Sequence, residues 1–139
     1  MDLVRLLRGL IALEVVLTVI AFMAHPVFDA MLPDALQAWV NQRAETAFEP
    51  SDYASTGAGF ALLGAAFLSW YGLWRFRPWA PTLYACTWGI EIALVALIGP
   101  SVQAGPAAAL TELGVGISGL MLGIAWFSDL RHRYAEPLG

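Results

Sequence analysis

Residues 5–24, RLLRGLIALEVVLTVIAFMA, decide the fold class of this chain. After the arginines at its start, the stretch carries a single charged residue, Glu14. Its length matches the roughly 20 apolar helical residues that cross the hydrocarbon core of a bilayer. Further stretches of this kind follow at residues 53–74, 79–98 and 107–127. The sequence therefore predicts an all-α, four-transmembrane-helix bundle, built as a single integral membrane domain over residues 1–139.

The composition of the chain agrees with a lipid environment. Hydrophobic residues make up 59% of the 139 residues and charged residues 13%, whereas soluble domains are about 45–50% apolar and about one quarter charged. A net charge of −4 gives no basic surface for nucleic acid. The single cysteine excludes an internal disulfide, and the two histidines form no zinc pattern. We expect the lipid bilayer as a partner, with no nucleic acid, metal or cofactor.

The arginines predict how the bundle is oriented. Six of the seven lie before the first span, between the second and third, or after the fourth: Arg5, Arg8, Arg75, Arg77, Arg131 and Arg133. Loops rich in arginine remain in the cytoplasm, so both termini are expected there. The same interface is expected to hold the aromatic residues Trp70, Tyr71, Trp74, Trp79 and Trp126. The absence of lysine, with abundant alanine and glycine, is typical of a GC-rich bacterial genome and favours the bacterial inner (plasma) membrane.

The long connection between the first two spans, residues 25–52, predicts a short amphipathic helix in the outer loop. Pro33 and Asp34 form a start signal and Pro50 a stop. Apolar residues recur between them at steps of three and four: Leu36, Trp39, Val40, Ala44, Ala47 and Phe48. Such a helix lies flat on the membrane or caps the bundle, and its acidic polar face favours the cap. The first span itself is expected to stay uncleaved, because Glu14 interrupts the apolar core that a signal peptide needs.

Small residues form one line along each of the second and fourth spans: Gly57, Ala61, Gly64 and Gly72 in the second, and Gly116, Gly119 and Gly123 in the fourth. Small residues let helix backbones approach closely in lipid, where no hydrophobic force drives helices together. Helix packing within the chain is the direct prediction. The alternative is that these grooves accept a lipid tail or another copy of the protein.

Three glutamates, Glu14, Glu91 and Glu112, fall inside the apolar stretches. A charged side chain at mid-bilayer costs about 2.5–3.5 kcal/mol, and no arginine lies at matching depth. We therefore expect the glutamates to face the bundle interior. A rise of 1.5 Å per residue puts Glu91 about 4 Å and Glu112 about 7 Å further out than Glu14. That spacing allows the three glutamates to approach one another. If the first span begins at Gly9 instead, Glu14 lies closer to the cytoplasm and the cluster opens, so both arrangements stay open.

Helical neighbours extend this candidate site for a ligand or a proton. Thr18 and His25 share a face with Glu14, and Thr87 and Trp88 lie next to Glu91. Burial and like charge both favour protonation, so at least one glutamate is expected to be neutral at pH 7. Two residues have plainer interpretations. Glu112 could simply be a residue in the first turn of its helix, stabilised by the helix dipole. His25 could simply be a histidine at the membrane interface.

Known catalytic patterns are missing. A di-iron bundle needs Glu-x-x-His steps, and the chain has none. Ser128, Asp129 and His132 fit a solvated helix tail better than a nucleophilic triad. No phosphate-binding or dinucleotide-binding loop occurs. The sequence therefore predicts a protein that is not an enzyme, with a lipid-modifying enzyme as the alternative left open.

Two resemblances arise at these residues. The segment Ala12-Leu13-Glu14-Val15 resembles the first-helix glutamate motif of the small multidrug-resistance exporters. That resemblance implies that Glu14 exchanges a cationic drug for a proton. The arginines of residues 5–9, the glycine-rich residues 57–67 and the turn at 75–81 resemble DoxX-like and related small four-helix bacterial membrane proteins. This second resemblance implies the fold and supplies no catalytic residues.

Two functions remain open from the sequence. In the first, the glutamates form an intrabundle site for a proton, a cation or an amphipathic small ligand, which predicts a polar cavity holding at least two of them. In the second, the protein is an accessory or assembly subunit of a larger membrane complex or a homo-oligomer. That function predicts a glutamate, or the face from Gly119 to Gly123, turned outward.

Overall fold

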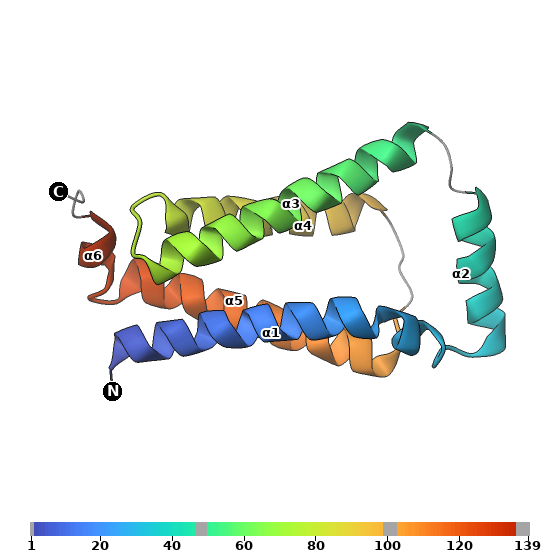
Figure 1. Ribbon diagram of the computed structural model, residues 1–139, viewed down its shortest axis with the longest axis horizontal. Coiled ribbons are helices and arrows are strands. Elements are labelled where there is room, and N and C mark those ends of the chain that lie inside the picture. Colours follow the sequence, from blue (N-terminus) through green and yellow to red (C-terminus); the bar gives the residue numbers. More distant parts are fainter. Residues whose placement is uncertain (1, 47–49, 99–102, 136–139) are drawn as a thin grey trace.

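A computed structural model describes residues 2–46, 50–98 and 103–135 of the chain (Figure 1). This part of the chain is helical and contains no strand, which confirms the predicted all-α class. The helices are α1 (Leu3–Asp29), α2 (Asp34–Thr46), α3 (Pro50–Trp74), α4 (Ala80–Ile98), α5 (Gly105–Phe127) and α6 (Arg131–Ala135).

Three helical segments among the described residues are long and apolar enough to cross a membrane: Leu3–Asp29, Gly57–Trp74 and Gly105–Phe127. The fourth predicted span corresponds to a shorter apolar segment, Ala80–Ala96 of α4. Large apolar side chains such as Phe22 and Phe60 are exposed on these helices. Since lipid tails are as apolar as these side chains, such exposure fits a membrane protein.

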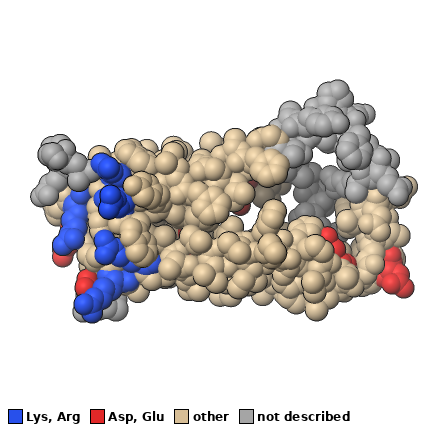
Figure 2. All heavy atoms as spheres, viewed as in Figure 1, with Lys and Arg blue, Asp and Glu red and all other residues tan. Residues whose placement is uncertain are grey.

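The four long helices form two pairs. α1 packs along α5, and α3 packs along α4, while contacts between the pairs are fewer (Figure 1). Both ends of the described chain, Asp2 and Ala135, lie at one end of the molecule, and the described arginine side chains gather there (Figure 2). We call this the basic end. α2 crosses the opposite end, which we call the α2 end (Figure 1).

The packed core occupies the basic half of the bundle. It contains buried side chains from all four long helices and from α6, including Leu7, Ile11, Leu73, Ala80, Met121 and Tyr134. Towards the α2 end the two helix pairs diverge (Figure 1). The space-filling view shows an opening between the pairs in that half of the molecule (Figure 2).

A tight turn joins α3 to α4 at the basic end. Phe76 adopts a positive φ of 54°, and the N–H of Arg77 donates to the carbonyl of Gly72 over 2.9 Å. This pattern closes a helix with a left-handed residue, a position that glycine usually fills. The guanidinium carbons of Arg8 and Arg133 lie 5.9 Å and 5.6 Å from the centre of the Phe76 ring. These cation–π contacts help to stabilise the strained residue.

The outer connection differs from the prediction in its boundaries. α1 continues through Pro26 to Asp29, beyond the expected end at residue 24, and Pro50 begins α3 where a stop was expected. The predicted start of the outer helix is confirmed, because α2 begins at Asp34. Ala47 and Phe48 of its predicted apolar stripe lie outside the described residues.

α2 takes the position of a cap without packing closely as one. It lies across the end of the molecule (Figure 1), yet the described residues show little contact between α2 and the four long helices. Leu36 and Trp39 are exposed. In this respect α2 resembles a helix lying on the membrane surface more than a packed cap.

The predicted glycine packing is observed at Gly72, where a Cβ would lie 2.7 Å from the Ala80 Cβ and 2.7 Å from the Trp79 ring. It is not observed at Gly57, Gly64, Gly116, Gly119 or Gly123. A Cβ at any of these five positions would meet no described atom of another element within 4 Å. The open glycines therefore leave the alternative of an occupant from outside the chain.

Candidate functional site

Glu14 is the buried residue of α1 that lies furthest along the helix from the basic end. It follows Leu7 and Ile11 on one face of α1, at steps of four and three, and all three side chains are buried. Only 6% of Glu14 is exposed, and no other acidic residue in the described part of the chain is buried. The predicted inward orientation of this glutamate is therefore what the structure has.

Three side chains converge on the Glu14 carboxyl group. The Trp70 Nε1–H donates to Oε2 over 2.8 Å, and the Tyr84 hydroxyl donates to Oε1 over 2.5 Å. The Ser118 Oγ lies 2.5 Å from the same Oε1. Trp70, Tyr84 and Ser118 are themselves buried. We call these four residues the Glu14 site.

Each of the four long helices contributes one residue to the Glu14 site. Glu14 comes from α1, Trp70 from α3, Tyr84 from α4 and Ser118 from α5. The site thus connects the α1–α5 pair to the α3–α4 pair where their separation begins. Hydrogen bonds between helices are among the few directional forces available in lipid.

Ser118 has two hydrogen-bond neighbours and a single proton to donate. Its Oγ lies 2.5 Å from Glu14 Oε1 and 2.9 Å from the Gly114 carbonyl oxygen. When Glu14 is ionised, Ser118 donates to it. When Glu14 is protonated, its O–H can donate to Ser118 Oγ, while the serine proton turns to the carbonyl. The site therefore offers hydrogen bonds to both protonation states of the carboxyl group.

The charge of an ionised Glu14 is not neutralised by a cation. The ion pairs among the described residues are Arg5 with Asp2 and His25 with Asp29, and neither involves Glu14. Every group that contacts its oxygens is a neutral donor. Within the described residues, an ionised Glu14 is therefore stabilised by hydrogen bonds and not by an ion pair.

Glu91 is the second glutamate of the predicted cluster. Tyr84, Thr87 and Glu91 recur on one face of α4, which runs from the Glu14 site towards the α2 end. Glu91 is exposed, seven residues along α4 from Tyr84, so it is not buried in the bundle interior as predicted. Thr87 is buried, and its hydroxyl donates to the Leu83 carbonyl over 2.9 Å. The structure thus places Glu91 on the face of α4 that carries Tyr84, without a hydrogen bond to Glu14.

Glu112 does not join the cluster. It is exposed on α5, six residues from Ser118, about 9 Å along the helix. Its interpretation as a first-turn residue is also wrong, because α5 begins at Gly105 and has no acidic residue in its first turn. The prediction of a three-glutamate cluster is therefore not met.

The remaining predicted residues lie around the site or away from it. His25 is exposed, and its Nδ1 lies 2.9 Å from Asp29 Oδ2, about 16 Å along α1 from Glu14. Thr18, one turn beyond Glu14, is half-buried and does not donate to its carboxyl group. Trp88 is half-buried and packs on the core. None of these three residues hydrogen-bonds to Glu14 in the described structure, and His25 is also far from it.

The sequence analysis did not predict three of the four residues of the Glu14 site: Trp70, Tyr84 and Ser118. Trp70 lies four residues from the end of α3 and was expected at the interface, yet it is 6% exposed. Side chains lean towards the N-terminus of their helix. Trp70 on α3 therefore leans towards the α2 end, while Glu14 on α1 leans back towards the basic end. The signal in the sequence is that each of the three side chains can donate a hydrogen bond from within a predicted span.

The chemistry of the Glu14 site suits a proton better than a metal ion. The described residues contain no group of three or more His, Cys, Asp or Glu side chains placed to hold a metal. Hard cations need several oxygen ligands, whereas the N–H and O–H groups here direct protons at the carboxyl oxygens.

Comparison with protein families, curated proteins and solved structures finds no significant match to the chain. The resemblances to small multidrug-resistance exporters and to DoxX-like proteins therefore stay predictions. The functional argument rests on the site itself.

Proposed function

We propose that this chain is a non-enzymatic multipass membrane protein whose buried carboxyl group, Glu14, binds and releases a proton. The observation that carries the proposal is the convergence of donors from three helices on one carboxyl group. Ionisable groups inside membrane bundles commonly serve proton or substrate pathways. Ser118 adds the ability to hydrogen-bond either protonation state.

Protonation at this position would alter the contact between the helix pairs. Hydrogen bonds to an ionised carboxylate are about twice as strong as those between neutral groups. Trp70 and Tyr84 supply such bonds from α3 and α4 to Glu14 of α1. Proton binding would therefore weaken the connection between the pairs, and proton release would strengthen it.

We infer that exchange with Glu14 takes place from the α2 end, past Glu91. Glu91 lies along α4 between the Glu14 site and the α2 end, and it is exposed. A cation or an amphipathic small ligand entering from that end would compete with the proton for the ionised form of the glutamates. Exchange of a cationic drug for a proton, which the exporter-like motif at residues 12–15 implies, is one form of this competition.

Infrared difference spectroscopy of the full chain in detergent tests the proposal. The carbonyl stretch of a protonated carboxylic acid is separate from the carboxylate bands, so Glu14 can be followed as pH changes. We expect a protonated-acid band in the wild type that is lost in Glu14→Gln and kept in Glu112→Gln, the matched control from an exposed position. The same band in Glu14→Gln, or no protonated acid in the wild type between pH 5 and pH 9, would refute the proposal.

A second function is favoured by the outward face of α5. Glu112, Gly116 and Gly119 are exposed on this helix, and no described atom fills the space beside the two glycines. An accessory or assembly subunit would present such a face to a partner membrane helix. Purification from native membranes tests this alternative. The wild type should purify with a stoichiometric partner or a second copy, which should be lost in Gly119→Leu and retained in Gly64→Leu. A wild-type chain that purifies alone as a monomer rules out the assembly function.

We further propose that the protein lies in a bacterial inner membrane with both termini in the cytoplasm. The clustering of arginines at the basic end supports this orientation through the positive-inside rule. A reporter that is active only in the cytoplasm should be active when fused to either terminus, and a reporter that is active only outside the cytoplasm should be inactive at both. Activity of either reporter outside the cytoplasm would reverse the assignment.

A further inference from the structure

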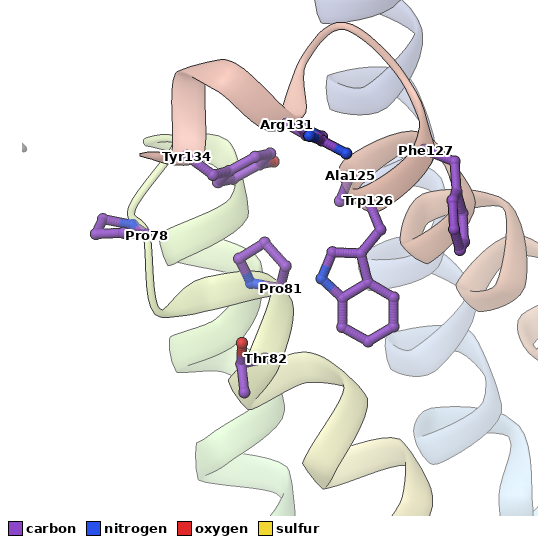
Figure 3. Close-up of a pocket in the computed structure, with 8 residues that line it drawn as sticks. All are labelled: Pro78, Pro81, Thr82, Ala125, Trp126, Phe127, Arg131 and Tyr134. Atoms are coloured by element: carbon purple, nitrogen blue, oxygen red, sulfur yellow. The ribbon is translucent and has the colours of Figure 1, made fainter. Parts of the chain in front are cut away.

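A pocket of about 490 Å³ lies at the basic end, separate from the Glu14 site. It is open on the surface and is bordered by the start of α4, the end of α5, and α6 (Figure 3). Trp126 faces Pro81 and Thr82 across it, and Arg131 and Tyr134 lie at its α6 end (Figure 3). Pockets of about 300–1,000 Å³ suit ligands of small-molecule size.

The lining has an apolar part and a cationic part. Arg131 is the one charged residue among the described residues that line the pocket. No carboxylate in the described part of the chain forms an ion pair with it. Arg8, Arg75 and Arg133 at the same end lie over aromatic rings, at 5.3 to 6.0 Å. Arg131 therefore differs from these arginines in facing a pocket.

The apolar wall is continuous with the surface that α5 presents to lipid. Phe127 is 87% exposed, and Trp126 and Leu120 are also exposed on this helix. An aromatic side chain at the end of a spanning helix lies at the level of lipid headgroups. A ligand in the pocket would therefore place its polar group beside Arg131 and its apolar part against Trp126 and the neighbouring bilayer.

From this arrangement we propose that the pocket binds one anionic phospholipid, with the phosphate of the headgroup at Arg131. The volume admits a headgroup and the first part of the acyl chains, while the rest of the chains stays in the bilayer. Charge complementarity favours an anionic lipid over a zwitterionic one, because basic pockets beside spanning helices attract anionic headgroups. This site does not depend on proton binding at Glu14.

Native mass spectrometry of the detergent-solubilised full chain, titrated with phosphatidylglycerol or phosphatidylcholine, tests the site. We expect the wild type to retain phosphatidylglycerol in preference. Arg131→Gln should weaken this binding about fivefold, as expected for one arginine at a membrane surface. The matched control is Arg5→Gln, since Arg5 is exposed at the same end, pairs with Asp2 and lies outside the pocket. The control should leave the preference unchanged.

A second variant separates the pocket from a general effect of charge. Thr82→Trp fills the space without removing Arg131 and should weaken binding of both lipids. Equal losses in Arg131→Gln and Arg5→Gln would overturn the proposal, as would unchanged binding in Thr82→Trp. Displacement of the lipid by an equal concentration of glycerol phosphate would show that the site takes a free phosphate, and that result also overturns it.

Discussion

Removal of the Tyr84 hydroxyl gives the sharpest test of the Glu14 site. Tyr84 is 4% exposed and donates to Glu14 Oε1 over 2.5 Å, so Tyr84→Phe deletes one donor and preserves the ring that packs on the core. A hydrogen bond to an ionised group contributes about 1.5–3 kcal/mol. Bonds between neutral side chains in a membrane bundle average about 0.6 kcal/mol. The cost of Tyr84→Phe should therefore increase by about 1 kcal/mol or more as Glu14 loses its proton.

This difference can be measured as a pH-dependent free energy of unfolding. SDS titration in mixed micelles, followed by tryptophan fluorescence, compares the wild type with Tyr84→Phe from pH 5 to pH 9. The cost should rise with pH and become independent of pH when Glu14→Gln is also present. Tyr71→Phe is the matched control, because Tyr71 is 54% exposed near the same end of the bundle. A cost for Tyr84→Phe that stays constant with pH, or does not exceed that of Tyr71→Phe, would refute the reasoning.

Three further predictions concern packing and the basic end. Gly72→Ala should lower the free energy of unfolding by about 1–3 kcal/mol, because the added methyl group overpacks against Ala80 and Trp79. Gly64 has open space around it, so Gly64→Ala should change the free energy of unfolding by less than about 0.5 kcal/mol in the same SDS titration. Leu7→Ala, at a fully buried position, should cost about 2 kcal/mol in that assay, at the low end for cores because lipid is already apolar; a cost equal to that of Leu13→Ala, on the exposed face of α1, would contradict the described core. Burial raises the pKa of the Tyr134 phenol, so the stability that this group contributes is complete below about pH 10 and is lost as pH rises further. The free energy of unfolding should therefore fall less steeply at alkaline pH in Tyr134→Phe than in the wild type. Identical pH dependences in the two proteins would contradict the burial of Tyr134.

The apolar runs and Glu14 could be predicted because they follow from one physical rule. A bilayer requires long apolar helices and excludes unpaired carboxylates. Three candidate spans and the inward position of Glu14 agree with this rule. The outward position of Glu112 could not be predicted in this way. It depends on where α5 begins relative to its neighbours.

The partners of Glu14 were harder to predict for a related reason. The depth of a side chain in the bilayer was predicted by counting residues from the end of its span. This count assumes that all helices begin at the same depth and that side chains point straight out from the helix axis. Trp70 is close to its helix end by this count, yet it reaches Glu14. Gly72 was also indistinguishable from the open glycines by pattern. Only the turn at Phe76 shows that α3 and α4 must approach there.

In lipid, the surface and the core of a bundle are both apolar, so apolar periodicity alone does not determine which helix faces meet. The Glu14 site supplies this information, because Trp70, Tyr84 and Ser118 satisfy one carboxyl group only when all four long helices are correctly arranged. An apolar residue at position 14 would avoid the cost of burying a carboxyl group and would pack against the same neighbours. It would bind no proton. Because the three groups that hydrogen-bond to Glu14 come from α3, α4 and α5, a change of protonation at this one residue would alter the hydrogen bonds of α1 to all three helices.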